Sequence, residues 1–392
     1  MTEEESKNVV TSATKKYSLK DLILYFLKLG TLGFGGPVAL VGFMHRDLVE
    51  EKKWITEDDY KEGLALAQLA PGPLAAQLGI YIGYVHYKLI GATLAGLAFV
   101  IPSFIIVLAI SYAYVSYGGL PWMQAVFYGV GASVIGIIAL GSYRLTIKSI
   151  GNDKLLWIVF IIVGVTTFLT EQELLTLILA GGFAVWFTKA PPKWMSSANL
   201  FIPAILMHGE SNIVQFKLVD IAWFFAKAGA FVFGSGLAIV PFLYGGVVKE
   251  YQWLNEQEFV DAVAVAMITP GPVVITVGFI GYLVSGFWGA VVAATATFLP
   301  CYLFTVIPAP YFKKYGKHPG IKAFVDGVTA AAIGAIAGAV LVLAKRTLAD
   351  IPTILISFTT AVLLFRFKKI QEPFVILAAA LIGIVLKILV NS

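Results

Sequence analysis

Long apolar runs constrain the fold of this chain more than any other feature of its sequence. One of them is LIGATLAGLAFVIPSFIIVLAISYAYV at 89–115, and others occupy 155–169 and 374–390. A helix needs about 20 apolar residues to cross a bilayer, and only helices and closed barrels satisfy the backbone there. Because the runs lack the alternation of a barrel strand, the sequence predicts an all-α polytopic membrane protein.

The composition supports this prediction and excludes several classes of function. Hydrophobic residues make up 59% of the 392 residues and charged residues only 13%, against about 25% charged in soluble domains. One cysteine (Cys301), four scattered histidines and the lack of a GxxxxGKS/T motif predict no disulfide, metal, cofactor or ATPase. No nucleophile–base set stands out, so we expect no enzyme. The net charge of +5 lies mostly in loops and sets topology, so we expect the lipid bilayer, not nucleic acid, as a partner.

The sequence contains one long segment twice. At an offset of 199, residues 21–79 align without gaps to 220–278, and 19 of these 59 positions are identical, Trp54 and Trp253 among them. At an offset of 198 the match continues to the end of each repeat. We therefore predict a polar N-terminal tail, a first membrane repeat, a linker and a second membrane repeat, at 1–19, 20–188, 189–219 and 220–390.

Equivalent loops of the two repeats differ in charge. The loop at 168–173 is acidic and its counterpart at 365–369 is basic, whereas the loop at 144–154 is richer in cations than 345–350. Short cytoplasmic loops carry an excess of Lys and Arg, so equivalent loops are expected on opposite sides of the membrane. We predict homologous repeats of inverted topology, as in many secondary transporters, whose substrates bind near the bilayer midplane.

Each repeat opens with short helical pieces that glycine and proline interrupt. In the first repeat we expect them at 20–34, 37–51, 56–70 and 73–88. Proline cannot donate to the helix ladder, and glycine adopts conformations that other residues avoid. Inside a membrane such breaks are tolerated only within protein or beside water, and each helix that starts there presents a positive dipole end to an anion. Whether the broken segments cross the membrane or fold back stays open.

The breaks and the neutral polar residues beside them predict a binding site for a small oxyanion. Neutral donors can bind a dianion without the cost of burying a fixed charge. Close helix packing is the alternative role for the small residues. The candidate substrate-binding residues are Phe34, Gly35, Gly36, Pro37, Gln68, Pro71, Gly72, Pro73, Gln77, Gly234, Ser235, Gly236, Thr269, Pro270, Gly271, Pro272 and Thr276.

Charged residues inside the apolar pieces suggest two further roles. Lys28 and Lys227 occupy equivalent positions before the glycine breaks, and they either add a positive field for the anion or extend to the membrane surface. Glu62 and Asp261 are also equivalent, and they are our candidates for proton coupling. Arg46 has no charged counterpart in the second repeat, so either one side of the pathway carries a cation that the other lacks or this segment is a helix end at the surface.

Two other acidic segments are expected to cap helices. Thr56 precedes Asp59 by three residues, and Asn255 precedes Glu258 in the same way. This is the spacing at which an N-cap side chain and an acidic side chain satisfy the first backbone N–H groups of a helix. Capping therefore explains these acids better than a proton relay.

Three segments of the first repeat resemble the motifs of a known family. FGGPVALVGFMHRDLV, KWITEDDY and ALAQLAPGPLAAQLGIYIGY, with their counterparts in the second repeat, are similar to the chromate ion transporter family in its long, two-domain form. The resemblance covers residues 20–390. It implies an inner-membrane carrier that exports chromate, coupled to an ion gradient or to anion exchange, with sulfate as a competing analogue. The motif residues are Phe34, Gly35, Gly36, Pro37, Pro71, Gly72, Pro73, Phe233, Gly234, Pro270, Gly271 and Pro272.

The residues alone predict a small tetrahedral oxyanion, and chromate comes from the resemblance. A sulfate or other oxyanion carrier and an anion channel gated at the breaks remain as alternatives. Ser235-Gly236 stands where the first half has Gly36-Pro37, so the two half-sites are expected to differ. A homodimer is a further hypothesis.

Overall fold

A computed structural model describes the chain at residues 17–34, 36–117, 121–170, 175–191, 217–231, 239–312, 318–367, 370 and 372–391. All regular structure in these residues is helical. Among the described residues, four helices are long and apolar enough to cross a membrane: Leu74–Tyr117, Trp122–Ile150, Val273–Tyr311 and Pro319–Thr347. The prediction of an all-α polytopic membrane protein is confirmed.

The two halves of the chain contain the same kinds of element in the same order. The first half contains α1 (Leu19–Leu32), α2 (Gly36–Met44), a π-helical turn (His45–Glu51), α3 (Glu57–Leu69), α4 (Leu74–Tyr117), α5 (Pro121–Ile150), α6 (Lys154–Thr170) and α7 (Leu175–Lys189). The second contains α8 (Lys217–Phe231), α9 (Ile239–Leu243), a π-helical turn (Tyr244–Glu250), α10 (Glu256–Ile268), 3₁₀ turns (Val273–Ile275, Ala309–Tyr311), α11 (Thr276–Val306), α13 (Pro319–Thr347), α14 (Ile351–Arg366) and α15 (Glu372–Asn391).

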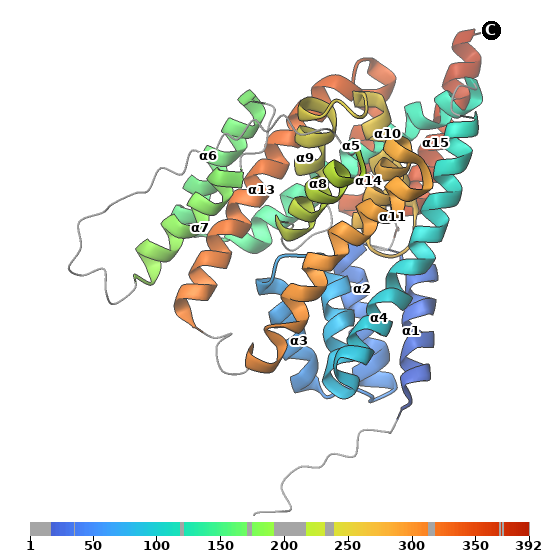
Figure 1. The fold of residues 1–392 in the computed structure, drawn as a ribbon. Helices are drawn as coiled ribbons and strands as arrows, with labels where there is room; N and C mark the ends of the chain where they lie inside the picture. Colours follow the sequence, from blue (N-terminus) through green and yellow to red (C-terminus); the bar gives the residue numbers. More distant parts are fainter. Residues whose placement is uncertain are drawn as a thin grey trace, which may run out of the picture.

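The interrupted segments of the first half fold back instead of crossing. Tyr17, just before α1, stacks on Trp54 in the α2–α3 connection with ring centroids 4.8 Å apart. The hydroxyl of Tyr17 is hydrogen-bonded to Nδ1 of His86 at 2.6 Å, near the end of the first part of α4. The start of α1, the α2–α3 connection and this part of α4 therefore lie together at one end of the molecule (Figure 1).

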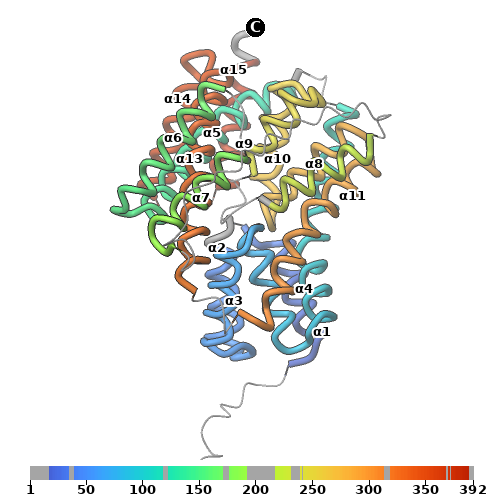
Figure 2. The backbone as a smooth tube through the Cα atoms, turned by 60° about the vertical axis from the view of Figure 1, so that its left-hand side comes forward, coloured from blue at the N-terminus to red at the C-terminus, as the bar shows by residue number. Residues whose placement is uncertain are grey.

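Both halves reverse direction at equivalent positions inside a long helix. The backbone turns at Lys88 in α4, where φ is 52°, and at Gly286 in α11, where φ is 61°. Beside each reversal two glycines let the segments touch backbone to backbone, Gly83 with Gly91 and Gly281 with Gly289. Only the part of each helix after the reversal crosses the molecule from end to end (Figure 2).

The last two helices of each half pack on the other half. Helices α6 and α7 lie against α13, and α14 and α15 lie against α5 (Figure 1). A Cβ on Gly129 of α5 would collide with the carbonyl of Ala379 on α15, and the equivalent contact joins Gly327 of α13 to Gly181 of α7. The halves are therefore interlocked around a shared core.

The hairpins of the two halves lie at opposite ends of the molecule. Helices α1–α3 occupy one end, and α8–α10 occupy the other (Figures 1 and 2). The second part of α4 starts at the first end and reaches α10, where the hydroxyl of Tyr114 donates to Asp261. This arrangement is consistent with the inverted repeats that the loop charges predict.

The predicted helix caps are confirmed. The Thr56 side chain accepts a hydrogen bond from the backbone N–H of Asp59, and Asn255 and Glu258 form a reciprocal capping box at α10. Glu57 follows the first cap, and hydrogen bonds from His45 and Lys61 lower the pKa of its carboxyl. The acids at these two helix starts thus stabilise local structure.

The contact between α5 and α15 makes a prediction about stability. Gly129→Ala should lower the free energy of unfolding by about 1–3 kcal/mol, because the new methyl group displaces the backbone of Ala379. Gly42→Ala is the control, since nothing lies within 4 Å of that Cβ position. Thermal unfolding of both variants in detergent tests this, and equal melting temperatures would contradict the close packing of α5 on α15.

Candidate functional site

The tips of hairpins from the two halves meet inside the protein. The backbone N–H of Gly271, in the second Pro-Gly-Pro turn, donates to the carbonyl of Gly33 at the end of α1, at 2.9 Å. The hydroxyl of Ser103 on α4 donates to the carbonyl of Gly30 at 3.2 Å and lies against the Cα of Gly271, whose φ is 93°. One break of each half therefore takes part in a single buried junction.

The first Pro-Gly-Pro turn contacts the equivalent residue of the other half. A Cβ on Gly72, whose φ is 142°, would lie 3.1 Å from Sγ of Cys301 on α11. Cys301 is equivalent to Ser103, and Gly72 is equivalent to Gly271. Each turn is thus covered by the long helix of the other half, and only glycine fits both the backbone angle and the space.

Gln77 stabilises the first Pro-Gly-Pro turn through the NH₂ group of its side-chain amide. The side chain is completely buried, and Nε2 donates to the carbonyl of Pro71 at 2.7 Å. Because that carbonyl can only accept, the amide orientation is settled and Oε1 points the other way. Within the described part of the chain, Oε1 has no hydrogen-bond partner.

The start of α4 adds backbone donors next to this amide. The first hydrogen bond of the helix runs from the N–H of Gln77 to the carbonyl of Pro73, at 3.0 Å. The N–H groups of Leu74, Ala75 and Ala76 precede it and have no acceptor one turn back. Neutral donors and one neutral acceptor therefore surround this break, together with the positive end of the helix dipole.

The equivalent break of the second half is chemically different. Thr276 replaces Gln77, and its hydroxyl donates to the carbonyl of Ala262 at 2.7 Å. The hydroxyl of Thr269 donates to the carbonyl of Val265 at 2.7 Å. The hydroxyl groups at this break thus already have partners, which supports the expectation that the two half-sites differ.

The remaining candidates at the breaks are placed as follows. Phe34 and Pro71 are partly buried, Gly72, Pro73, Pro270, Gly271 and Pro272 are buried, and Gln68 is exposed at the end of α3. Gly36 and Pro37 begin α2, which therefore starts at the first break. The candidates Gly35, Phe233, Gly234, Ser235 and Gly236 lie outside the described residues.

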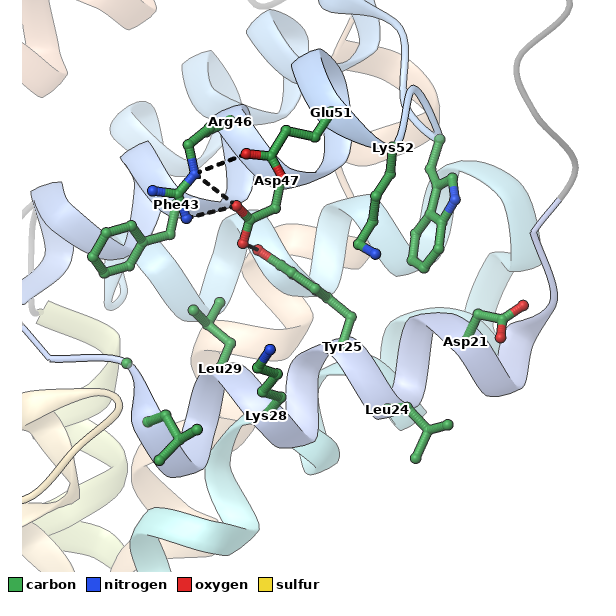
Figure 3. A pocket seen from close by; sticks show the side chains of 13 residues that line it. Asp21, Leu24, Tyr25, Lys28, Leu29, Phe43, Arg46, Asp47, Glu51 and Lys52 are labelled. Carbon is green, nitrogen blue, oxygen red and sulfur yellow. Dashed lines mark hydrogen bonds and ion pairs between the residues drawn. The ribbon is translucent and has the colours of Figure 1, made fainter.

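An open groove of about 650 Å³ leads along α1 to the junction (Figure 3). Lys28 points into it (Figure 3), and Gly33, whose carbonyl accepts from Gly271, is another of its lining residues. Arg46 is paired with Asp47 at 2.7 Å and reaches Glu51 at 3.5 Å. Lys52 and the carboxylate of Asp21 also line the groove. Among the described residues no carboxylate lies within ion-pair distance of Lys28, so its ammonium group can interact with an anion in the groove.

Lys227 has a different environment from its counterpart Lys28. It lies over the ring of Trp223, with Nζ 5.7 Å from the centroid, and lines an apolar groove between α8 and α11. The second half has Gly245 and Gly246 where the first has Arg46 and Asp47, so it lacks the counterpart of that ion pair. Its surroundings fit a lysine that extends along an apolar surface.

The two coupling candidates differ in burial. Asp261 is 3% exposed, and its carboxylate accepts hydrogen bonds from the hydroxyl of Tyr114 at 2.8 Å and from Nε2 of Gln257 at 2.9 Å. It lines a cavity of about 500 Å³ that also contains Lys387. Glu62 is partly buried and accepts a hydrogen bond from Tyr81.

Sequence reasoning missed the residues that cover the breaks. Ser103 and Cys301 are small polar residues one repeat apart in apolar helices, and this equivalence is the signal that points to them. Tyr114 gives no such signal, because its counterpart is Phe312. Its contact with Asp261 joins residues 147 positions apart and appears only in the folded chain.

Comparison with known proteins places the chain in a family. The model of the family described as chromate transporter matches residues 20–186 and 219–384. The chain belongs to the chromate transporter family. It is a multi-pass membrane protein of a transporter family, in agreement with the resemblance of its motifs.

Relatives match along nearly the whole chain. A chromate transport protein of Cupriavidus metallidurans is 68% identical over 374 residues, which cover 94% of this chain and 93% of that protein. A probable chromate transport protein of Synechococcus elongatus is 61% identical over 376 residues, 94% of this chain and 96% of that protein. A chromate transport protein of Pseudomonas aeruginosa is 29% identical over 392 residues, 93% and 92% of the two chains. No solved structure matches the chain.

The junction predicts the effect of a single methyl group. Gly271→Ala should lower the free energy of unfolding by about 1–3 kcal/mol, because φ is 93° and the new Cβ meets Oγ of Ser103. Adding Ser103→Ala should restore part of this loss by removing the collision while the backbone strain stays. Thermal unfolding of the single and double variants measures both effects, and purely additive losses would contradict the contact.

Proposed function

We propose that this protein is a secondary transporter that exports chromate across the plasma (inner) membrane and so confers resistance to it. The observation that carries the proposal is the junction of Gly271 with Gly33, because the breaks of both halves meet there and Gly33 and Lys28 line the same groove. Family membership supports chromate as the substrate. Sulfate, another tetrahedral dianion, is the expected competitor.

The groove and the breaks have separate tasks in this proposal. Lys28 attracts the anion toward Gly33 through a positive charge that has no carboxylate partner among the described residues. The first turn of α4 then offers neutral N–H donors, so that the anion is held without a fixed buried cation. Because no fixed cation contacts the anion there, we expect the anion to bind weakly enough to be released on the other side of the membrane.

Asp261 is the residue that we assign to energy coupling, with Glu62 as its counterpart in the first half. Among the described residues, Asp261 is the one charged side chain that is buried, and it sits beside the cavity at the far end of α4. A buried carboxylate is costly unless it is neutralised, so this position favours proton exchange. Tyr114 connects it to the long helix that also carries Ser103.

Anion flux in proteoliposomes tests the proposed function. Labelled chromate is placed on one chosen side, with sulfate or chromate on the other, and with or without a pH gradient. Saturable exchange that sulfate inhibits supports a carrier. A conductance far above carrier turnover supports the alternative of an anion channel, and faster flux of sulfate than of chromate supports a sulfate carrier. Cross-linking in native membranes tests the homodimer.

The two equivalent lysines should behave differently. Lys28→Gln should raise the KM for chromate several-fold, since a charge close to a partly solvated anion contributes about 1 kcal/mol. Lys227→Gln, whose ammonium group lies over Trp223, should leave KM within error of the wild type. An unchanged KM in Lys28→Gln would remove this lysine from the pathway.

Removing the carboxyl group of Asp261 should abolish coupling to a pH gradient without abolishing chromate exchange. In Asp261→Asn we expect chromate exchange to persist while stimulation by an imposed pH gradient disappears, because the amide cannot bind and release a proton. Asp326→Asn changes a half-buried acid on α13 that does not line the Asp261 cavity, and it should keep the stimulation. Gradient stimulation that survives in Asp261→Asn would point to Glu62, which Glu62→Gln then tests.

A further inference from the structure

The unpartnered oxygen of Gln77 is the feature that the proposed function does not yet use. It is an acceptor, buried completely, at the start of a helix whose other free groups are donors. A buried acceptor without a donor is destabilising, because it has lost its hydrogen bonds to water. The position therefore calls for a ligand that brings both bare oxygens for the N–H groups and one O–H group for Gln77.

A monoprotonated tetrahedral oxyanion has this combination of groups. Hydrogen chromate carries one hydroxyl and three bare oxygens, and it coexists with chromate near neutral pH. Sulfate has lost its last proton far below that pH, so it presents only acceptors. Facing Oε1 of Gln77, a bare sulfate oxygen would meet another acceptor.

The charge of the ligand leads to the same conclusion. The groups around the break are the neutral backbone N–H groups, the amide of Gln77 and the thiol of Cys301. The idealised cost of moving an ion into a medium of low dielectric rises with the square of its charge, so a monoanion costs about a quarter as much as a dianion of equal size. Neutral surroundings therefore favour the protonated form.

We propose that Gln77 accepts a hydrogen bond from the hydroxyl of hydrogen chromate, so that the transporter selects the monoprotonated oxyanion and discriminates against sulfate. The inference rests on the proposed function and names the species that is bound. Sites built to pair with a substrate hydroxyl discriminate strongly against analogues that lack it, because a buried polar group is left unpaired. Selection therefore resides in the first half, since Thr276 already donates to Ala262.

The pH dependence of wild-type KM provides the first test and needs no variant. Initial rates of chromate exchange are measured in proteoliposomes with equal pH on both sides, from below to above the pKa of hydrogen chromate. Above that pKa, KM for total chromate should rise about tenfold per pH unit, while KM for hydrogen chromate stays constant. A KM for total chromate that does not change with pH overturns the inference.

Sulfate separates titration of the substrate from titration of the protein. Cys301 faces the turn from α11, and the Glu62–Tyr81 pair lies on the adjoining helices α3 and α4. Titration of these groups would alter the inhibition constant of sulfate together with the KM for chromate. We expect the inhibition constant of sulfate to stay constant over the same pH range.

Gln77→Met tests the side chain itself, because Met is of similar size and cannot accept such a bond. Its KM for chromate should rise about tenfold, inhibition by sulfate should strengthen relative to chromate, and the pH dependence of KM should flatten. Thr146→Val removes a buried hydroxyl on α5 that donates to the carbonyl of Ser142, outside the breaks, and should keep the wild-type ratio and pH dependence. An unchanged ratio of sulfate to chromate affinity in Gln77→Met would assign Oε1 to a bound water and end the proposal. Absence of chromate flux at every pH would instead contradict the proposed function.

Discussion

The structure depends on the pairing of backbone groups where helices stop inside the membrane region. An unpaired N–H or C=O in hydrocarbon costs several kcal/mol, so a broken helix persists only when its ends find partners within the protein. Gly271 donates to Gly33, Gln77 donates to Pro71, and Thr276 donates to Ala262, and each of these bonds spans or joins a break. At Gly271 the absence of a side chain lets the opposite half approach closely enough for the bond to Gly33. The hairpins can therefore end inside the protein.

The helices of the two halves pack in nearly the same way, so differences between the residues at their breaks can be compared directly. Contacts one repeat apart are reproduced residue for residue, from Gly129 with Ala379 to Gly327 with Gly181, because each half packs its last two helices on the other. The same rule places Cys301 at one turn and Ser103 at the other. Because the helix packing is shared, the breaks differ in their side chains and not in the arrangement of their helices. The first half keeps an unsatisfied acceptor and a charged groove, whereas the second has its hydroxyl groups paired and an apolar groove beside Lys227.

Local sequence signals predict much of this fold, and contacts between distant residues account for the rest. The apolar runs predict a membrane protein, and glycine and proline predict the helix ends near Gly33 and Gly72 to within a few residues, since these effects act on the backbone itself. Folding back could not be predicted, because it depends on Tyr17 meeting Trp54 and His86. The different environments of Lys28 and Lys227 could not be predicted either. The two lysines are identical, but their neighbours, such as Arg46 and Gly245, differ.

The placement of charge suggests how binding and release can both be fast. A cation lies in the open groove, neutral groups line the break, and the one buried charged side chain of the described residues, Asp261, lies toward the opposite end. A fixed cation at the break would bind an anion more tightly and slow its release. An ionised Asp261 would repel an anion that leaves past it, whereas a protonated one would not. Under the proposed function, protonation of Asp261 would therefore ease the passage of the anion, and this effect needs no direct contact between the two groups.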